Sequence, residues 1–537
     1  MNGVGNRSSD NTAGAGAPRS KRVALQRLLS AALAGLVLAL LPLAGGEARG
    51  IIWLKTQQAT GNSGPYLHPV MATYRNHAYI LSVRETSQTT SSVYLTTNRS
   101  GSWKTSLVSN RGPTAGSYSQ EFVALAVDPQ SKRLYAAWIY GKTKQTVAIG
   151  VWSGDLSGNL STGPTEVFSA GTLPGQPTLA AGAGKVYLAF TATPGSAPGS
   201  CNDQTTHATD AVVATLANGS WSSPQNVTSC AATATSLSFE NPKVAVDESG
   251  HGYVIGLATG TQSNLWYTDN TSGSWSSPQQ VTHGASISEF AGSPAMRGLH
   301  AIAASRGAVY IAYAQDRGSN GDDIRLLSRS GGTWSGPVAV SPADPEGCHK
   351  FAVSVIARAG RVGVSYIRSF GGACHVVGTT NDFNTPQLRT GTPSHLTPIT
   401  LDLPKNASCG DTSLSSDGDL FRVALSCGLG SQQLAGKLFY KREFLDVVGP
   451  KSHLLARKTR SGIQLTWRAQ DPTPGAGVAG FQLQVRASGG QWRALPAPAH
   501  SRSLLYHASS GRHFVFRVRA RDRVNNWGPW ITAAAST

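Results

Sequence analysis

Short stretches in which apolar and polar residues alternate recur along most of the chain, and turns rich in glycine separate them. Alternation with a period of two predicts half-buried β-strands, as at 133–138, 185–190 and 308–313. A tryptophan in a Gly-Ser-Trp or Gly-Thr-Trp phrase returns about once per 50 residues, which indicates a repeat architecture. The phrases lie at 101–103, 219–221, 273–275 and 332–334.

The repeats predict a β-propeller between residues 51 and 445. Small antiparallel sheets arranged radially bury each other's faces and leave only short edges. Seven units can be counted, and the last, at 411–444, lacks an outer strand of its own. We expect the segment around Trp53 to complete the blade that contains Leu414 and Leu438, because such pairing closes the ring. A six-bladed ring is the alternative, because two units lack the expected tryptophan.

The first 48 residues are typical of a secretory signal peptide. A basic cluster that includes Arg19, Lys21 and Arg22 precedes an apolar run from Leu28 to Ala44. We therefore expect a secreted or cell-surface protein and a monomer. The alternative is an uncleaved signal anchor, which would be the chain's only contact with a membrane.

The six cysteines fit an exported protein, because disulfides persist in oxidising compartments. They fall two each into three of the repeats, so local pairing is the simplest prediction. Neither a C-x-x-C motif nor a paired histidine spacing is present, so no zinc site, no other metal and no cofactor is expected. The expected disulfides are Cys201–Cys230, Cys348–Cys374 and Cys409–Cys427.

Residues 453–537 predict a second all-β unit, a β-sandwich. Alternating runs lie at 463–467, 480–486 and 514–522, and the chain ends in a Trp-Gly-Pro-Trp segment. Together these motifs resemble a fibronectin type III domain, with Trp467 as its core tryptophan. The fold class predicted for the whole chain is therefore all-β, a seven-bladed or possibly six-bladed propeller followed by a sandwich.

Positive charge is concentrated in this C-terminal unit. The chain has 46 Lys and Arg against 28 Asp and Glu, and residues 446–537 hold 13 and 3 of them. Arg517, Arg519 and Arg521 alternate along one predicted strand and share a face with Arg486. This face suits an extracellular glycan or another cell-envelope polyanion, and a merely solvated strand face is the alternative. Nucleic acid is not expected, because no exposed aromatics are predicted between the arginines.

Turns at 97–103 and 269–275 resemble the Asp-box turns of the sialidase-like superfamily, with the aspartate displaced or absent. In that superfamily these turns are structural, so the resemblance implies the fold. The superfamily's enzymes hold a carboxylate with three arginines at the ring's mouth. The positions expected at the mouth here contain no arginine. They are His68, Glu121, Gln176, Asn241, Lys350 and Asp411, with Tyr66 and Tyr118 nearby.

Glu121 and Glu240 are the candidate catalytic pair, because glycoside hydrolysis needs two carboxylates flanking the scissile bond. The missing arginine cluster favours a different hypothesis, in which these polar groups line a binding channel. The sequence therefore predicts a glycan-binding propeller protein with a basic tethering module. The alternative is an exo-acting glycoside hydrolase of the sialidase type.

Overall fold

The computed structural model describes residues 50–537 except 62–64, 86–90, 111–122, 143–145, 171–174, 193–208, 229–237, 260–262, 284–286, 288–297, 319–320, 343–347, 370–383, 430–435, 497–501 and 510. The described residues are all-β and contain no α-helix. In this part of the chain, accordingly, no helix could span a membrane.

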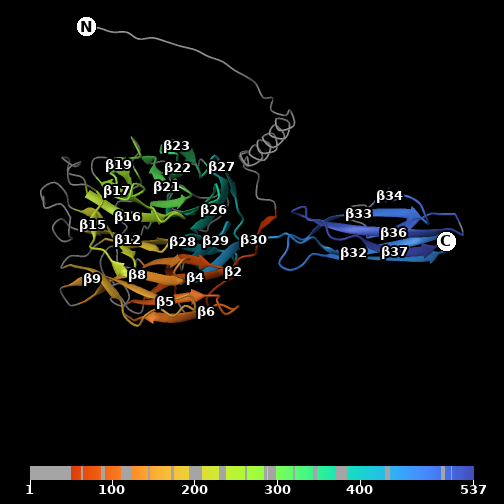
Figure 1. The fold of residues 1–537 in the computed structure, drawn as a ribbon, viewed down its shortest axis with the longest axis horizontal. Helices are drawn as coiled ribbons and strands as arrows, with labels where there is room; N and C mark the ends of the chain where they lie inside the picture. The colour runs from red at the N-terminus through yellow and green to blue at the C-terminus, as the bar shows by residue number, and fades with distance from the viewer. Residues whose placement is uncertain are drawn as a thin grey trace, which may run out of the picture. The chain divides into compact units, whose positions relative to one another are not determined.

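Residues 51–445 form seven antiparallel sheets, each built mainly from strands that are consecutive in the chain (Figure 1). The first three sheets consist of β3 (Leu67–Tyr74), β4 (His77–Glu85), β5 (Ser91–Thr97) and β6 (Lys104–Ser109); β7 (Val123–Asp128), β8 (Arg133–Gly141), β9 (Val147–Asp155) and β10 (Thr165–Ala170); and β11 (Thr178–Gly182), β12 (Lys185–Ala192), β13 (Asp210–Ala217), β14 (Ser220–Trp221) and β15 (Gln225–Asn226).

The next three sheets repeat this meander. They consist of β16 (Ser238–Val246), β17 (Gly252–Thr259), β18 (Asn264–Asp269) and β19 (Gln279–Gln280); β20 (His300–Ser305), β21 (Ala308–Asp316), β22 (Asp322–Ser330) and β23 (Thr333–Ala339); and β24 (Lys350–Arg358), β25 (Arg361–Arg368), β26 (Thr385–Thr392) and β27 (His395–Pro398). We call β3, β7, β11, β16, β20, β24 and their counterpart in the seventh sheet, β28, the inner strands.

The seventh sheet combines the two ends of this region. Its strands are β28 (Ala407–Asp417), β29 (Leu420–Leu429), β30 (Lys437–Leu445), β1 (Ile51–Trp53) and β2 (Gln57–Gln58). β1 pairs with β30, with Trp53 opposite Glu443, so the strand of Trp53 adds to the sheet of Leu414 and Leu438 as predicted. Two distant chain segments therefore share one set of backbone hydrogen bonds.

Each apolar core cluster in this region is shared by two neighbouring sheets. Central strands of these sheets are apolar on both faces, as in β8, where residues 134–140 are all buried, so every sheet packs on two others. Met71 and Ile80 of the first sheet pack with Leu438 and Tyr440 of the seventh, so the last sheet contacts the first. The inner strands contact one another in the same order, and β28 contacts β3.

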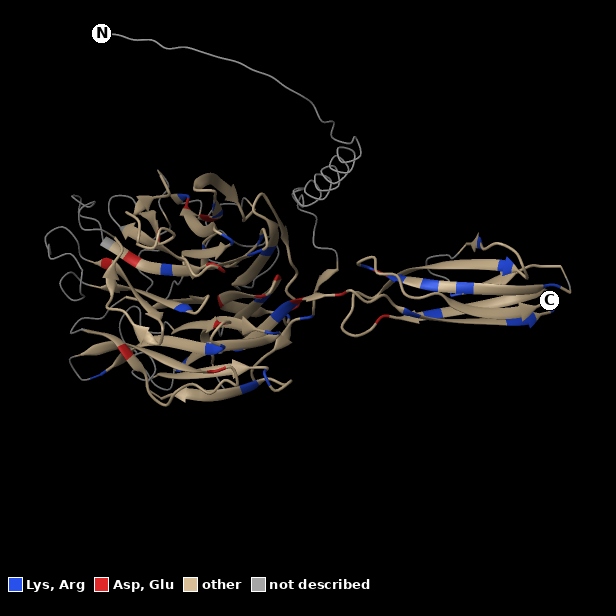
Figure 2. Cartoon of the chain, viewed as in Figure 1, with Lys and Arg blue, Asp and Glu red and all other residues tan. Residues whose placement is uncertain are grey.

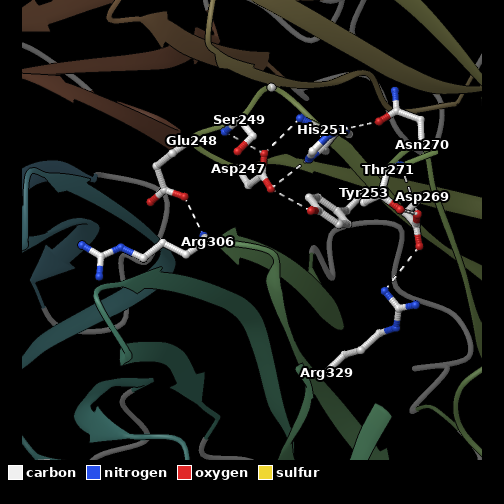
Figure 3. A network of polar contacts seen from close by, with 12 residues as sticks. Asp247, Glu248, Ser249, His251, Tyr253, Asp269, Asn270, Thr271, Arg306 and Arg329 are labelled. Atoms are coloured by element: carbon white, nitrogen blue, oxygen red, sulfur yellow. Dashed lines mark hydrogen bonds and ion pairs between the residues drawn. The ribbon is translucent and has the colours of Figure 1, made fainter. Parts of the chain in front are cut away.

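Carboxylates in the hairpin turns join neighbouring sheets (Figure 3). Glu248, after β16, accepts hydrogen bonds from the backbone N–H of Arg306 at 2.6 Å and from the Ser305 hydroxyl at 2.9 Å. Burial alone would raise the pKa of Glu248, but these hydrogen bonds and the Arg358 guanidinium lower it overall. Arg329 reaches Asp269 in the same manner, at 3.4 Å. These contacts join neighbouring sheets at the turn after β16 and at the end of β18.

Residues 451–536 form two sheets that face each other. One contains β31 (Lys451–Thr459), β32 (Gly462–Gln470) and β35 (Ser503–Tyr506), and the other contains β34 (Arg493–Leu495), β33 (Val478–Ala487), β36 (His513–Asp522) and β37 (Ile531–Ser536), in that order. Trp467, Leu483 and Phe516 share their core. This is a β-sandwich, with Trp467 buried at its centre.

Cys409 and Cys427 form a disulfide between opposed residues of β28 and β29. This is the local pairing within one repeat that the cysteine spacing predicts. Cys348 is also disulfide-bonded. Cys201, Cys230 and Cys374 lie outside the described residues, so their pairing stays a prediction.

Candidate binding cavity

A cavity of about 270 Å³ lies where the inner strands come together. All seven inner strands, or the residues directly before them, contribute to its wall. Its polar lining comprises His68, Gln176, Thr178, Lys243, His300, Ser354, Asp411, Thr412 and Ser413. Val70, Leu125, Ile302 and other apolar side chains form the rest. Such a mixture of an apolar wall with a few polar groups is typical of small-ligand sites.

His68 and Asp411 form an ion pair at the cavity wall and join the first sheet to the seventh. His68 Nδ1 lies 2.7 Å from Asp411 Oδ2, and the two side chains are only 13% and 14% exposed. His68 occupies a β-bulge, where β3 shifts its register against β4 and φ is +56°. The bulge interrupts the ladder and redirects the side chain, a common device next to functional sites.

Lys243 brings a positive charge into the cavity. Its Nζ lies 3.5 Å from Gln176 Oε1, and burial lowers the pKa of the lysine to about 8. An ammonium removed from water is costly unless an anion balances it. Among the described lining residues the only carboxylate is Asp411, which His68 engages. Lys243 therefore makes the cavity favourable for an anionic group.

His300 lies in the cavity wall beside this lysine. Its Nε2 lies 2.8 Å from the backbone oxygen of Asn241, and because a carbonyl only accepts, Nε2 carries the proton. Burial and the charge of Lys243 lower the pKa of His300 to about 3, so the ring is neutral. Its buried Nδ1 has no hydrogen-bond partner within the described residues. Because this atom is fully buried, His300 forms a neutral part of the wall beside Lys243 and is not a contact for a ligand.

The structure brings three of the sequence-predicted mouth residues to this cavity: His68, Gln176 and Asp411. Asn241 contributes through its backbone carbonyl, at a bulge that matches the one at His68. Tyr66 does not line the cavity. It is buried in the core between the first and seventh sheets, edge-on to Tyr94.

Lys350, which the repeat pattern predicts at the mouth, does not line the cavity. The bulge of β24 falls after Phe351, and Ala352, with φ of +51°, takes the position that His68 and Asn241 have in their strands. Lys350 lies two residues earlier, 1% exposed, and its Nζ donates to the backbone oxygen of Asp322. Its backbone N–H and its ammonium both donate to Asp322 at the start of β22, and Ser354 lines the cavity in its sheet.

Of the two candidate catalytic carboxylates, Glu240 lies within the described residues and Glu121 does not. Glu240 is exposed and is not among the lining residues. Glu121 and Tyr118 lie outside the described residues. The described cavity wall therefore offers one carboxylate, whereas the usual hydrolytic mechanisms need two.

The arginines of the sandwich form a ladder with three tryptophans. Arg517 stacks on Trp492 and Trp530, 4.1 and 4.3 Å from the ring centroids, and Arg519 stacks on Trp530 and Trp527, 4.7 and 4.4 Å away. The sequence analysis expected no aromatics between these arginines, and this expectation was wrong. Trp492 lies in the loop before β34, and Trp527 and Trp530 lie between β36 and β37, so the strand pattern alone does not place these loop residues beside the arginines.

Sequence reasoning missed Lys243 and His300. A signal for Lys243 exists: Asn-Pro at 241–242 marks the bulge of β16, and Lys243 follows it directly. Sequence reasoning also missed a cluster of three carboxylates, in which one oxygen each of Asp446, Asp471 and Asp522 lies within 4.8 Å of the other two. Burial and the other two carboxylates raise the pKa of Asp471.

The neutral buried His300 predicts a loss of stability in acid. Its folded pKa, about 3, lies below the ordinary 6.5, so its contribution is complete above pH 6.5 and falls as the pH drops from 6.5 toward 3. Each pH unit in this window costs about 1.4 kcal/mol of unfolding free energy. We expect His300→Gln, which can still donate to Asn241, to flatten this decline in urea titrations. The exposed His395→Gln is the control, and an unchanged slope in His300→Gln would refute the assignment.

Comparison with protein families found no family model that matches the chain, and no curated protein matches it in sequence. Solved structures that are similar to it include the polysaccharide lyase Uly1, 10% identical over 73% of this chain and 92% of the other, with a TM-score of 0.47. Trypanosoma rangeli sialidase is 9% identical over 91% and 89%, with a TM-score of 0.37. The α-L-arabinofuranosidase Arb93A from Fusarium graminearum is 11% identical over 73% and 98%, with a TM-score of 0.36.

Proposed function

We propose that this chain is an exported protein that binds an extracellular acidic glycan in the central cavity of a β-propeller. The observation that carries the proposal is the cavity itself, in which Lys243 has no carboxylate partner among the described residues. A carboxylated or sulfated sugar would balance this charge. Hydroxyls of the sugar would reach Gln176 and the His68–Asp411 pair.

The seven sheets are, in this proposal, the blades of one closed ring. Three features support closure: β1 pairs with β30, the core cluster of the first sheet includes side chains of the seventh, and inner strands of all seven sheets line one cavity. Closure also protects the sheet edges, which would otherwise be open to pairing with other chains.

The sandwich is proposed to be a fibronectin type III-like module that tethers the propeller. Its strand order, β31-β32-β35 against β34-β33-β36-β37, and the buried Trp467 support this. Export through residues 1–48 and action as a monomer belong to the same proposal. The Cys409–Cys427 disulfide supports an oxidising location.

Binding is proposed over hydrolysis because Asp411, the one carboxylate in the described cavity wall, is paired with His68. The test is a glycan array with the purified chain, run beside a panel of fluorogenic glycosides. We expect retention of glycans with carboxylate or sulfate groups and no release of fluorophore. If the wild-type chain hydrolyses a glycoside, and if Glu121→Gln or Glu240→Gln abolishes this activity without changing the melting temperature, the glycosidase alternative is established instead.

A further inference from the structure

The outer face of the β33–β36 sheet is a pre-organised cationic surface. Arg486, Arg517, Arg519 and Arg521 lie on it, and Trp492, Trp530 and Trp527 lie between their guanidinium groups. We call these seven residues the Arg–Trp ladder. Cation–π stacking holds each guanidinium plane in place, so little side-chain entropy remains to be lost on binding.

Hydrogen bonds fix the inner edges of the two central guanidinium groups. Arg517 Nε and Nη2 donate to Gln484 Oε1 at 2.8 and 2.6 Å, and Arg519 Nε donates to Gln482 Oε1 at 2.8 Å. Within the described residues, none of the ladder arginines forms an ion pair with a carboxylate. The remaining N–H groups are therefore available to an external anion.

The charge distribution of the sandwich favours an anionic partner strongly. Residues 447–537 contain 13 Lys and Arg and only two acidic residues, Asp471 and Asp522, which cluster with Asp446. Figure 2 shows Lys and Arg positions along the sandwich strands. Burial together with the charges of Arg519 and Arg486 lowers the pKa of Arg517, because the neighbouring guanidinium groups repel one another. A bound polyanion would relieve this repulsion.

We propose that the Arg–Trp ladder binds a linear acidic polysaccharide, one that carries sulfate or carboxylate groups along its length. This deepens the tethering role proposed above and rests on it. Arg517, Arg519 and Arg521 are alternate residues of β36 and therefore lie about 7 Å apart. They offer a row of bidentate donors to successive anionic groups. The site is separate from the propeller cavity, and it would take the polymer while the cavity takes a single sugar.

Single-stranded nucleic acid is the competing polyanion, and the ladder geometry disfavours it. Nucleic-acid sites of this kind need free aromatic faces on which bases can stack. Trp492 lies 4.7 and 4.1 Å from Arg486 and Arg517, and Trp527 lies 4.4 and 5.6 Å from Arg519 and Arg521. Trp530 is likewise contacted by two guanidinium groups. Each indole of the ladder is thus already engaged by two arginines.

The test measures binding of the full chain to immobilised heparin, polygalacturonate, neutral dextran and oligo-dT by biolayer interferometry. We expect Arg517→Gln/Arg519→Gln to weaken binding to heparin or polygalacturonate about tenfold. The matched control is Arg457→Gln/Lys458→Gln, which removes two exposed charges from β31 in the opposite sheet. Equal losses in both pairs, equal binding of oligo-dT, or no binding to either acidic polymer would overturn the proposal.

Two further variants keep the result interpretable. Arg521→Gln, at the exposed end of the ladder, tests the surface if the double variant does not fold. Lys185→Met, which removes an exposed charge of the propeller region outside the cavity wall, is expected to leave polymer binding unchanged. For the wild-type chain, binding to heparin without any binding on the glycan array would reject the cavity proposal alone, and array binding without binding to heparin or polygalacturonate would reject the ladder alone.

Discussion

Replacing Lys243 with methionine is expected to abolish binding of an anionic sugar and, at the same time, to raise the stability of the protein. The lysine is half-buried and has no carboxylate partner among the described residues, and removal of its ammonium from water lowers its pKa to about 8. Compared with the ordinary 10.5, this shift corresponds to an unfavourable free energy on the order of 3 kcal/mol when the ammonium is charged. Methionine fills a similar volume without the charge.

The sign of the pH dependence follows from the same shift. Because the folded pKa is lowered, the penalty is complete below about pH 8 and disappears as the pH rises from 8 to 10.5. Urea titrations at pH 7, 8.5 and 10 should show the wild-type protein gaining stability over this window and Lys243→Met gaining less. The exposed Lys185→Met is the control and should change neither property. Retained binding, or a lower unfolding free energy in Lys243→Met, would contradict the assignment.

The strand pattern predicts the repeat region well because period-two alternation, glycine turns and tryptophan spacing all report local structure. It also predicts the pairing of Ile51–Trp53 with the last repeat, since the missing outer strand is visible as a deficit. The residues at the mouth of the ring were harder to predict from the sequence than the strands. His68 and Asn241 each precede a proline at the bulge, which identifies the position in the sequence. Ala352 precedes no proline, so the sequence pattern predicts Lys350, two residues earlier, at the corresponding position.

Side chains whose role depends on distant segments were beyond the pattern. The proton of His300 is placed on Nε2 by the hydrogen bond to the backbone carbonyl of Asn241, which lies 59 residues away in the sequence. The Arg–Trp ladder likewise depends on Trp492 and Trp530 folding over β36 from separate loops. Burial, and with it the pKa of Lys243, is set by the convergence of seven sheets, which no single repeat encodes.

Asp417 links the seventh sheet to the first, and Asp417→Ala is expected to weaken this contact severely. Arg422 is fully buried, and its Nη2 lies 2.8 Å from Asp417 Oδ2. Asp417 also accepts hydrogen bonds from the backbone N–H groups of Arg75, at 2.9 Å, and Asn76 in the turn between β3 and β4. One carboxylate therefore neutralises a buried cation and joins the two ends of the repeat array.

Removing one partner of a buried ion pair leaves the other charge uncompensated, which costs about 3 to 5 kcal/mol. We expect Asp417→Ala to lose that much unfolding free energy in urea and to accelerate hydrogen exchange in β3 and β28. The neighbouring exposed Asp419→Ala should change little. Because the penalty comes from the stranded guanidinium, Asp417→Ala/Arg422→Met should recover most of the loss. If the double variant is as unstable as Asp417→Ala, the backbone hydrogen bonds to Arg75 and Asn76, rather than the buried charge, hold the two sheets together.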